Sequence, residues 1–159
     1  MCKCFLQDGS FIVRGTVRDK HNEKKIAPLK NAFGHLFSQL ELFEADLLKP
    51  ETLDAAIEGC DYVVHTASPF PDKEPKDENI LIKPAVEGTL AVMRAAQKHK
   101  VKRVVITSSV AAIMMHTDAN KKDVYDESDW SELEACKAYE KSKTLAEKAA
   151  WDFLSSLPE

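Results

Sequence analysis

A tyrosine and a lysine lie four residues apart near the C-terminal end of the sequence, in the stretch Tyr139-Glu140-Lys141-Ser142-Lys143. In a helix this spacing brings the phenol and the ammonium group to one face, one turn apart. A nearby cation favours the phenolate form, so such a pair can pass a proton to or from a substrate oxygen. The same spacing is also common on solvated helix faces, so other residues must decide between the two interpretations.

A serine at the end of an apolar stretch is the third candidate catalytic residue. The segment 101–107 is rich in Val and Ile and predicts a strand, and Ser109 follows it closely. In a parallel sheet the carboxyl end of a strand lies beside the next helix, so Ser109, Tyr139 and Lys143 are predicted to converge on one reacting oxygen. The serine would orient a carbonyl, the tyrosine would donate the proton, and the lysine would keep the tyrosine acidic. Serines after a strand are also common turn formers. The hydride that this chemistry needs is supplied by no side chain, so a nicotinamide cofactor is implied.

Apolar strand-like segments alternate with helical ones along the whole chain. Strands are predicted at 11–17, 40–45, 61–67 and 101–107, and helices after Asn22, at Pro50, from Asn79 to Lys100 and around Tyr139. This order predicts the α/β class, as a Rossmann-like doubly wound parallel sheet with helices on both faces. The segment 61–67 is apolar enough to predict burial on both of its faces. The proline-rich segment 68–77 predicts an irregular loop.

The carboxyl ends of these strands carry candidate cofactor-binding residues, since ligands of such sheets bind there. In chain order they are Arg18 with Lys25, Asp46 with Leu47, Thr66 with Ala67, and Thr107, together with Tyr139 and Lys143. An arginine suits a 2′-phosphate, which indicates NADP, while a carboxylate and an apolar side chain suit an adenine. The competing interpretations are a solvated basic turn at Arg18 and, at Asp46, an acid that favours the start of a helix.

The composition is that of a globular protein with one domain: 44% of residues are hydrophobic, 30% are charged, and the net charge is −4. This balance gives no reason to expect nucleic acid or a membrane as partner, and the partner expected from the chemistry above is a small-molecule carbonyl substrate. No signal peptide is recognised at the N-terminus, and the four cysteines are expected to be reduced thiols in a cytoplasmic protein without a metal site. The oligomeric state is left open. His65, within an apolar strand, is expected to be a core histidine.

Several motifs, in order along the chain, resemble the extended short-chain dehydrogenase/reductase family of the NAD-dependent epimerase/dehydratase superfamily. The likeness is greatest to dihydroflavonol 4-reductase, anthocyanidin reductase and cinnamoyl-CoA reductase. The motifs are Val13–Asp19, Ala45–Leu47, Val64–Pro69, Lys83–Thr89, Val105–Ser109, Tyr125–Trp130 and Tyr139–Lys143. The resemblance implies an NADP-dependent oxidoreductase that reduces a ketone or aldehyde to an alcohol. It also implies the catalytic and cofactor-binding roles given above for these residues.

The family's glycine-rich turn, which holds the cofactor pyrophosphate, has no counterpart here, because none of the five glycines forms such a cluster. The chain therefore resembles an internal piece, a partial NAD(P)-binding Rossmann domain over residues 1–159 without the first strand and the substrate domain. In the usual strand order the strand at 11–17 and the strand at 61–67 would face a gap one strand wide, or would pair directly. Weak cofactor binding and little or no turnover are expected of this length.

Other interpretations remain open at this point. The chain could be a non-catalytic dinucleotide-binding protein or a truncated isoform. Among enzymes, a hydroxysteroid dehydrogenase or a nucleotide-sugar epimerase shares the serine, tyrosine and lysine. Both rank below a reductase, because the segments Arg14–Asp19 and Lys83–Thr89 resemble those of the reductases.

Overall fold

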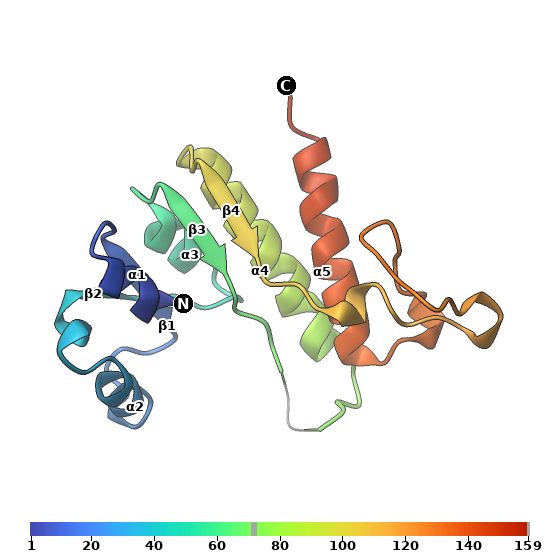
Figure 1. Ribbon diagram of the computed structural model, residues 1–159, viewed down its shortest axis with the longest axis horizontal. Helices are drawn as coiled ribbons and strands as arrows, with labels where there is room; N and C mark the ends of the chain where they lie inside the picture. The colour runs from blue at the N-terminus through green and yellow to red at the C-terminus, as the bar shows by residue number, and fades with distance from the viewer. Residues whose placement is uncertain (71–72, 159) are drawn as a thin grey trace.

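The computed structural model of the protein describes residues 1–70 and 73–158, in which helices and short strands alternate (Figure 1). The helices are α1 (Cys2–Asp8), α2 (Glu23–Phe33), α3 (Pro50–Ile57), α4 (Asn79–Lys98) and α5 (Ala138–Ser155), and the strands are β1 (Val13–Val17), β2 (Leu40–Glu44), β3 (Tyr62–His65) and β4 (Arg103–Ile106). Among these described residues four short 3₁₀ helices also occur: η1 (Gly34–Gln39), η2 (Val110–Ala112), η3 (Asp118–Asn120) and η4 (Leu133–Ala135). The predicted α/β alternation is confirmed. Of the loop predicted at 68–77, residues 71 and 72 lie outside the described part.

The strands form two parallel pairs. β1 pairs with β2, with Val13 opposite Leu40, and β3 pairs with β4, with Tyr62 opposite Arg103. Within residues 1–70 and 73–158 no ladder joins one pair to the other. The prediction of a parallel arrangement is confirmed, but the single sheet is divided. The sequence left two arrangements open for β1 and β3: direct pairing, or a gap between them. In the described residues they do not pair directly.

Prolines and glycines set several helix boundaries. Gly9 adopts a left-handed conformation (φ 76°) and its N–H donates to the carbonyl of Phe5 at 3.2 Å, which ends α1. Pro50 is the first residue of α3, where its missing N–H costs no helical hydrogen bond. α4 starts at Asn79 and continues through Pro84, so this proline does not mark the beginning of the helix. In the described part of the chain no helix combines the length and the apolar character that a membrane span requires.

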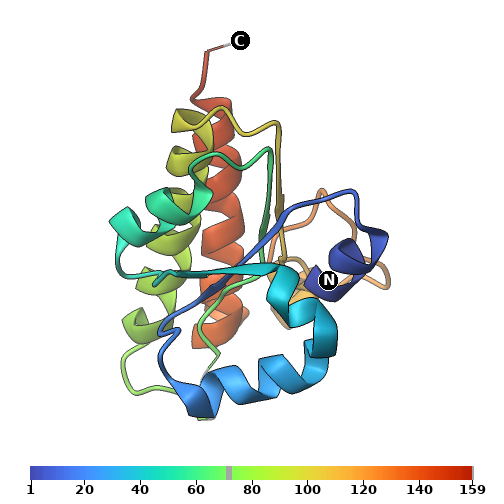
Figure 2. The same ribbon diagram turned by 90° about the vertical axis from the view of Figure 1, so that its left-hand side faces the viewer.

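Each strand pair has its own hydrophobic cluster. Leu53, Ile57 and Val92 belong to the cluster between α3 and α4, and Val63 and Val104 pack against it from β3 and β4. The other cluster consists of Leu6, Val13 and Leu36 and joins α1, β1 and η1. Figure 2 shows α3, α4 and α5 together on one side of β3 and β4. The helices that carry the candidate site are therefore packed on the second strand pair.

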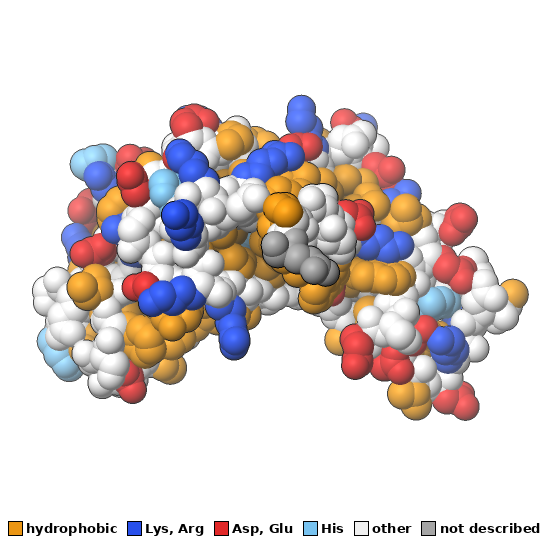
Figure 3. Space-filling view, turned by 90° about the horizontal axis from the view of Figure 1, so that it is seen from above, with side chains coloured by type: hydrophobic (Ala, Val, Ile, Leu, Met, Phe, Trp, Pro, Cys, Tyr) orange, Lys and Arg blue, Asp and Glu red, His pale blue; other side chains and the backbone are white. Residues whose placement is uncertain are grey.

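One face of the second strand pair is open, which corrects the prediction that the segment 61–67 is buried on both faces. Tyr62 is 56% exposed, Val64 37% and Val105 50%. These positions alternate with Val63 and Val104, which face the helices. α3 and α4 cover only that inner face, so the alternate side chains remain in solvent. Seen from above, the molecule is hollowed along one edge between its two ends, and hydrophobic side chains gather around the hollow (Figure 3).

Gly88 allows a close approach between α4 and the segment after β2. A Cβ atom at this position would lie 2.7 Å from Cδ2 and 3.0 Å from Cβ of Leu47. We expect Gly88→Ala to lower the free energy of unfolding by about 1–3 kcal/mol, because the added methyl group overpacks this contact. Urea denaturation measures the change.

The variant Leu47→Ala provides the matched background for this prediction, since it removes Cδ2 and Cγ of Leu47, the atoms 2.7 and 3.3 Å from the added methyl group, and leaves only Cβ at 3.0 Å. In that background Gly88→Ala is expected to cost clearly less. An equal cost in both backgrounds would show that the effect comes from the helix itself and not from the contact with Leu47.

Candidate active site

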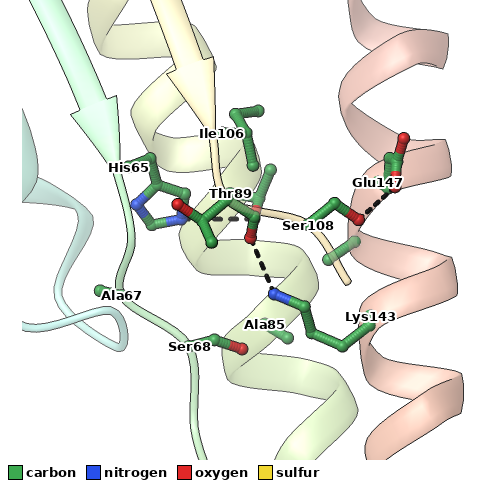
Figure 4. A pocket seen from close by; sticks show the side chains of 11 residues that line it. His65, Ala67, Ser68, Ala85, Thr89, Ile106, Ser108, Lys143 and Glu147 are labelled. Carbon is green, nitrogen blue, oxygen red and sulfur yellow. Dashed lines mark hydrogen bonds between the residues drawn. The ribbon is translucent and has the colours of Figure 1, made fainter. Parts of the chain in front are cut away.

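Lys143 is the most enclosed of the predicted catalytic residues. It lies on α5, its side chain is buried, and its Nζ donates a hydrogen bond to the carbonyl oxygen of Thr107 at 2.9 Å. This contact joins α5 to the end of β4 (Figure 4). Burial lowers the pKa of Lys143, since an ammonium group loses hydration there, and the carboxylate of Glu147 acts in the opposite direction.

The cavity around Lys143 is small. It is lined from β3, α4, the end of β4 and α5, and its volume is about 10 Å³. The lining includes His65, Ala67, Thr89, Thr107, Ser108 and Glu147. This volume is about the space that one water molecule occupies. The cavity therefore has room for little more than the polar groups that contact Lys143. A cofactor ring would have to lie outside it.

Tyr139 and Ser109 lie near the same end of α5. Tyr139 is half-buried in the first turn of the helix, and its ring meets that of Phe70 edge-on, with centroids 5.1 Å apart. Ser109 precedes η2, and its Oγ accepts a hydrogen bond from the N–H of Ala111 at 3.2 Å. η2 packs against α5, which brings Ser109 beside the helix that carries the other two residues. The Ser109 hydroxyl retains its own proton for donation.

The predicted cofactor residues are spread along the ends of the strands rather than gathered in one pocket. Arg18, just after β1, and Lys25, on α2, are exposed, and so are Thr66 and Ala67 after β3. Both groups follow the carboxyl ends of parallel strands, where a long ligand could reach them.

Asp46 and Leu47, the predicted adenine contacts, have structural partners. A carboxylate oxygen of Asp46 accepts from the N–H of Leu48 at 3.0 Å, and the side chain of Leu47 lies against Gly88 on α4. The turn that Asp46 stabilises leads into α3, in line with the competing interpretation of this residue as part of a helix start.

His65 is a buried neighbour of Lys143 that the sequence assigned to the core. Its side chain is 7% exposed and its Nε2 lies 3.5 Å from Oγ1 of Thr89. Burial, and secondly the charge of Lys143, lower the pKa of His65 to about 4. The imidazole is therefore neutral near pH 7, and it places no second positive charge beside the lysine.

The sequence of the chain matches the 3-beta hydroxysteroid dehydrogenase/isomerase family over residues 9–152. This span contains both strand pairs, the cavity and all the predicted catalytic residues. The chain belongs to this family.

Individual relatives confirm the predicted resemblance to dihydroflavonol 4-reductase and anthocyanidin reductase. Tetraketide alpha-pyrone reductase 1 of Arabidopsis thaliana is 44% identical over 160 residues, which are 96% of this chain and 48% of the relative. Dihydroflavonol 4-reductase of the same plant is 45% identical over 157 residues, 93% of this chain and 40% of that protein. The crystal structure of yeast methylglyoxal/isovaleraldehyde reductase Gre2 complexed with NADPH is 31% identical, with a TM-score of 0.78 over 96% of this chain and 48% of Gre2. The chain thus spans about half the length of these relatives.

Two residues of the site were not singled out in the sequence. Ser108 donates a hydrogen bond from its Oγ to Oε2 of Glu147, and both residues line the cavity together with Lys143 (Figure 4). A signal for Glu147 was present, because it follows Tyr139 and Lys143 at the same four-residue spacing and so belongs to the same helix face. Ser108 had no such signal, since two adjacent serines after a strand look alike until the backbone directs their side chains.

Proposed function

We propose that the protein is an NADP-dependent reductase that converts a ketone or aldehyde of a small organic molecule into an alcohol. The observation that carries this proposal is the position of Lys143: it is buried, bound to the end of β4, and one helical turn from Tyr139. The names of the relatives, which are reductases, support the same reaction class.

In this proposal Tyr139 gives its proton to the carbonyl oxygen of the substrate, and the hydroxyl of Ser109 donates a hydrogen bond to the same oxygen. The bound nicotinamide supplies the hydride that adds to the carbonyl carbon. Lys143, one helical turn from Tyr139 on α5, would stabilise the phenolate that the tyrosine leaves behind. With that hydride, the proton from Tyr139 would complete the conversion of the carbonyl group into an alcohol.

The residues on the chain fit parts of a dinucleotide. Arg18 offers a guanidinium for a 2′-phosphate, with Lys25 as a second cation, and both are exposed. The small residues Thr66 and Ala67 allow a flat group to approach the end of β3. The 159 residues contain no glycine-rich turn that would hold the cofactor pyrophosphate. Weak cofactor binding and low turnover by a chain of this length alone therefore stay a prediction.

The alternatives differ from this proposal in what they require of Tyr139. A non-catalytic dinucleotide-binding protein has no use for a proton donor, whereas a reductase depends on it. A hydroxysteroid dehydrogenase would use the same residues on a steroid alcohol or ketone, and the family match keeps this candidate. The substrate panel for any assay therefore includes a steroid ketone beside a dihydroflavonol and small aldehydes.

The choice of cofactor is tested at Arg18. We expect Arg18→Gln to raise the KM for NADPH about tenfold or more and to leave the KM for NADH nearly unchanged, because only NADPH carries the 2′-phosphate. The assay follows oxidation of each cofactor during substrate reduction by the protein in the longest form that its gene encodes. Lys24→Gln is the matched control, since it removes an exposed cation from the nearby helix α2. Equal effects of Arg18→Gln on both cofactors would contradict a role at the 2′-phosphate.

A further inference from the structure

Glu147 lies one turn after Lys143 on α5 and lines the same cavity. Its two carboxylate oxygens are held from different sides. Oε2 accepts the hydrogen bond from Oγ of Ser108, and Oε1 accepts one from Nε1 of Trp151 at 3.4 Å. The carboxylate is therefore fixed between the end of β4 and the next turn of its own helix.

Lys143 and Glu147 form hydrogen bonds with two consecutive residues at the end of β4. The ammonium group of Lys143 binds the carbonyl of Thr107, and the carboxylate of Glu147 binds the hydroxyl of Ser108. The two contacts are one turn apart on α5 and one residue apart after β4. Together they restrict sliding and rotation of α5 against β4. The helix face that carries the lysine is thereby held against this strand end.

The charges around the cavity give Glu147 a second effect. Burial lowers the pKa of Lys143 below its usual value, and the negative charge of Glu147 opposes part of this shift. Among the described residues that line the cavity, the other ionisable side chain is His65, which has its pKa lowered to about 4 and is neutral near pH 7. The lining from α4 and from the end of β4 is uncharged, as in Thr89 and Ser108. Glu147 thus provides the negative charge that offsets the burial of Lys143.

We propose that Glu147, hydrogen-bonded to Ser108, is a positioning residue that keeps Lys143 protonated and directed at the end of β4. Its importance for catalysis rests on the proposed function, because that function assigns Lys143 its role. The effect on the lysine itself depends only on the cavity and can be measured without cofactor or substrate.

Competitive acetylation tests the proposal, because only the unprotonated amine of a lysine reacts. The protein is treated with trace acetic anhydride across a range of pH, and mass spectrometry compares Lys143 with the exposed Lys24. We expect Glu147→Gln to increase the relative reactivity of Lys143 at pH 8 about threefold to tenfold, since a nearby opposite charge is lost. The matched control is Asp152→Asn, which removes a carboxylate from α5 that lines a separate groove between α4 and α5. It should leave the reactivity of Lys143 unchanged.

Ser108→Ala provides a second variant, should the first fail to fold. It keeps the charge but releases the carboxylate, so we expect a smaller rise in the reactivity of Lys143 than Glu147→Gln causes. An unchanged pH profile of Lys143 in folded Glu147→Gln, or an equal rise in Asp152→Asn, would overturn the proposal. Circular dichroism verifies that each variant is folded.

The two proposals can fail separately. If the protein reduces no carbonyl compound but Lys143 responds to Glu147→Gln, the positioning role stands and the reductase role does not. In an active enzyme, loss of Glu147 should also move the alkaline side of the pH profile of kcat to lower pH, because the lysine loses its proton earlier. A uniform loss of kcat at every pH would instead indicate damaged packing and would contradict the electrostatic role.

Discussion

Replacement of Tyr139 by phenylalanine is expected to lower kcat by about 10²–10⁴-fold, because it removes the group that donates the proton to the substrate oxygen. Binding of NADPH should change little, since the ring and its edge-on contact with Phe70 are retained. The measurement is steady-state NADPH oxidation, with cofactor binding followed in parallel by fluorescence titration, in the longest form of the protein that its gene encodes.

Tyr62→Phe is the matched control for this experiment. Tyr62 lies on the open face of β3, 56% exposed, so loss of its hydroxyl should not affect turnover. If Tyr139→Phe retained full activity while NADPH still bound, the proton donor would have to be another group. If the unsubstituted protein bound NADPH but reduced nothing in the substrate panel, the non-catalytic alternative would be favoured.

His65 is expected to make the fold less stable as the pH falls from about 6.5 to 4. Its pKa is lowered from 6.5 to about 4 in the folded protein, mainly by burial. Between these values the unfolded chain binds a proton that the folded chain does not, so protonation favours unfolding. The stabilisation is complete above pH 6.5 and is lost as the pH falls to 4. The loss amounts to at most about 3 kcal/mol.

Urea denaturation at several pH values between 7 and 4 measures this effect, and His65→Asn is the comparison. The variant cannot titrate in this range, so its stability should depend less on pH, whatever its absolute value. Carboxylates whose pKa is lowered, such as Asp54, lose their contribution mainly below their ordinary value of 3.8 and do so in both proteins. Parallel pH dependences for the two proteins would show that His65 is accessible to protons in the folded state.

Much of the secondary structure was predictable because its signals are local. Pro50 marked the start of a helix in the sequence, and α3 begins there in the structure. The error at the segment 61–67 has a different origin. An apolar sequence indicates that a strand can be buried. Whether both faces of the strand are covered depends on which helices pack on it. Here Val63 meets α3 and α4 while Val64 remains in solvent.

The sequence by itself determined that Tyr139, Lys143 and Glu147 share one helix face, because the period of a helix follows from its backbone. It also determined the parallel α/β alternation and the family resemblance. Only the tertiary structure decided what lies opposite that face. Ser108 meets Glu147 from 39 positions away, and the carbonyl of Thr107 meets Lys143 from 36 positions away. Such contacts, the neutral state of His65 and the division of the strands into two pairs depend on packing between distant segments, which no local pattern specifies.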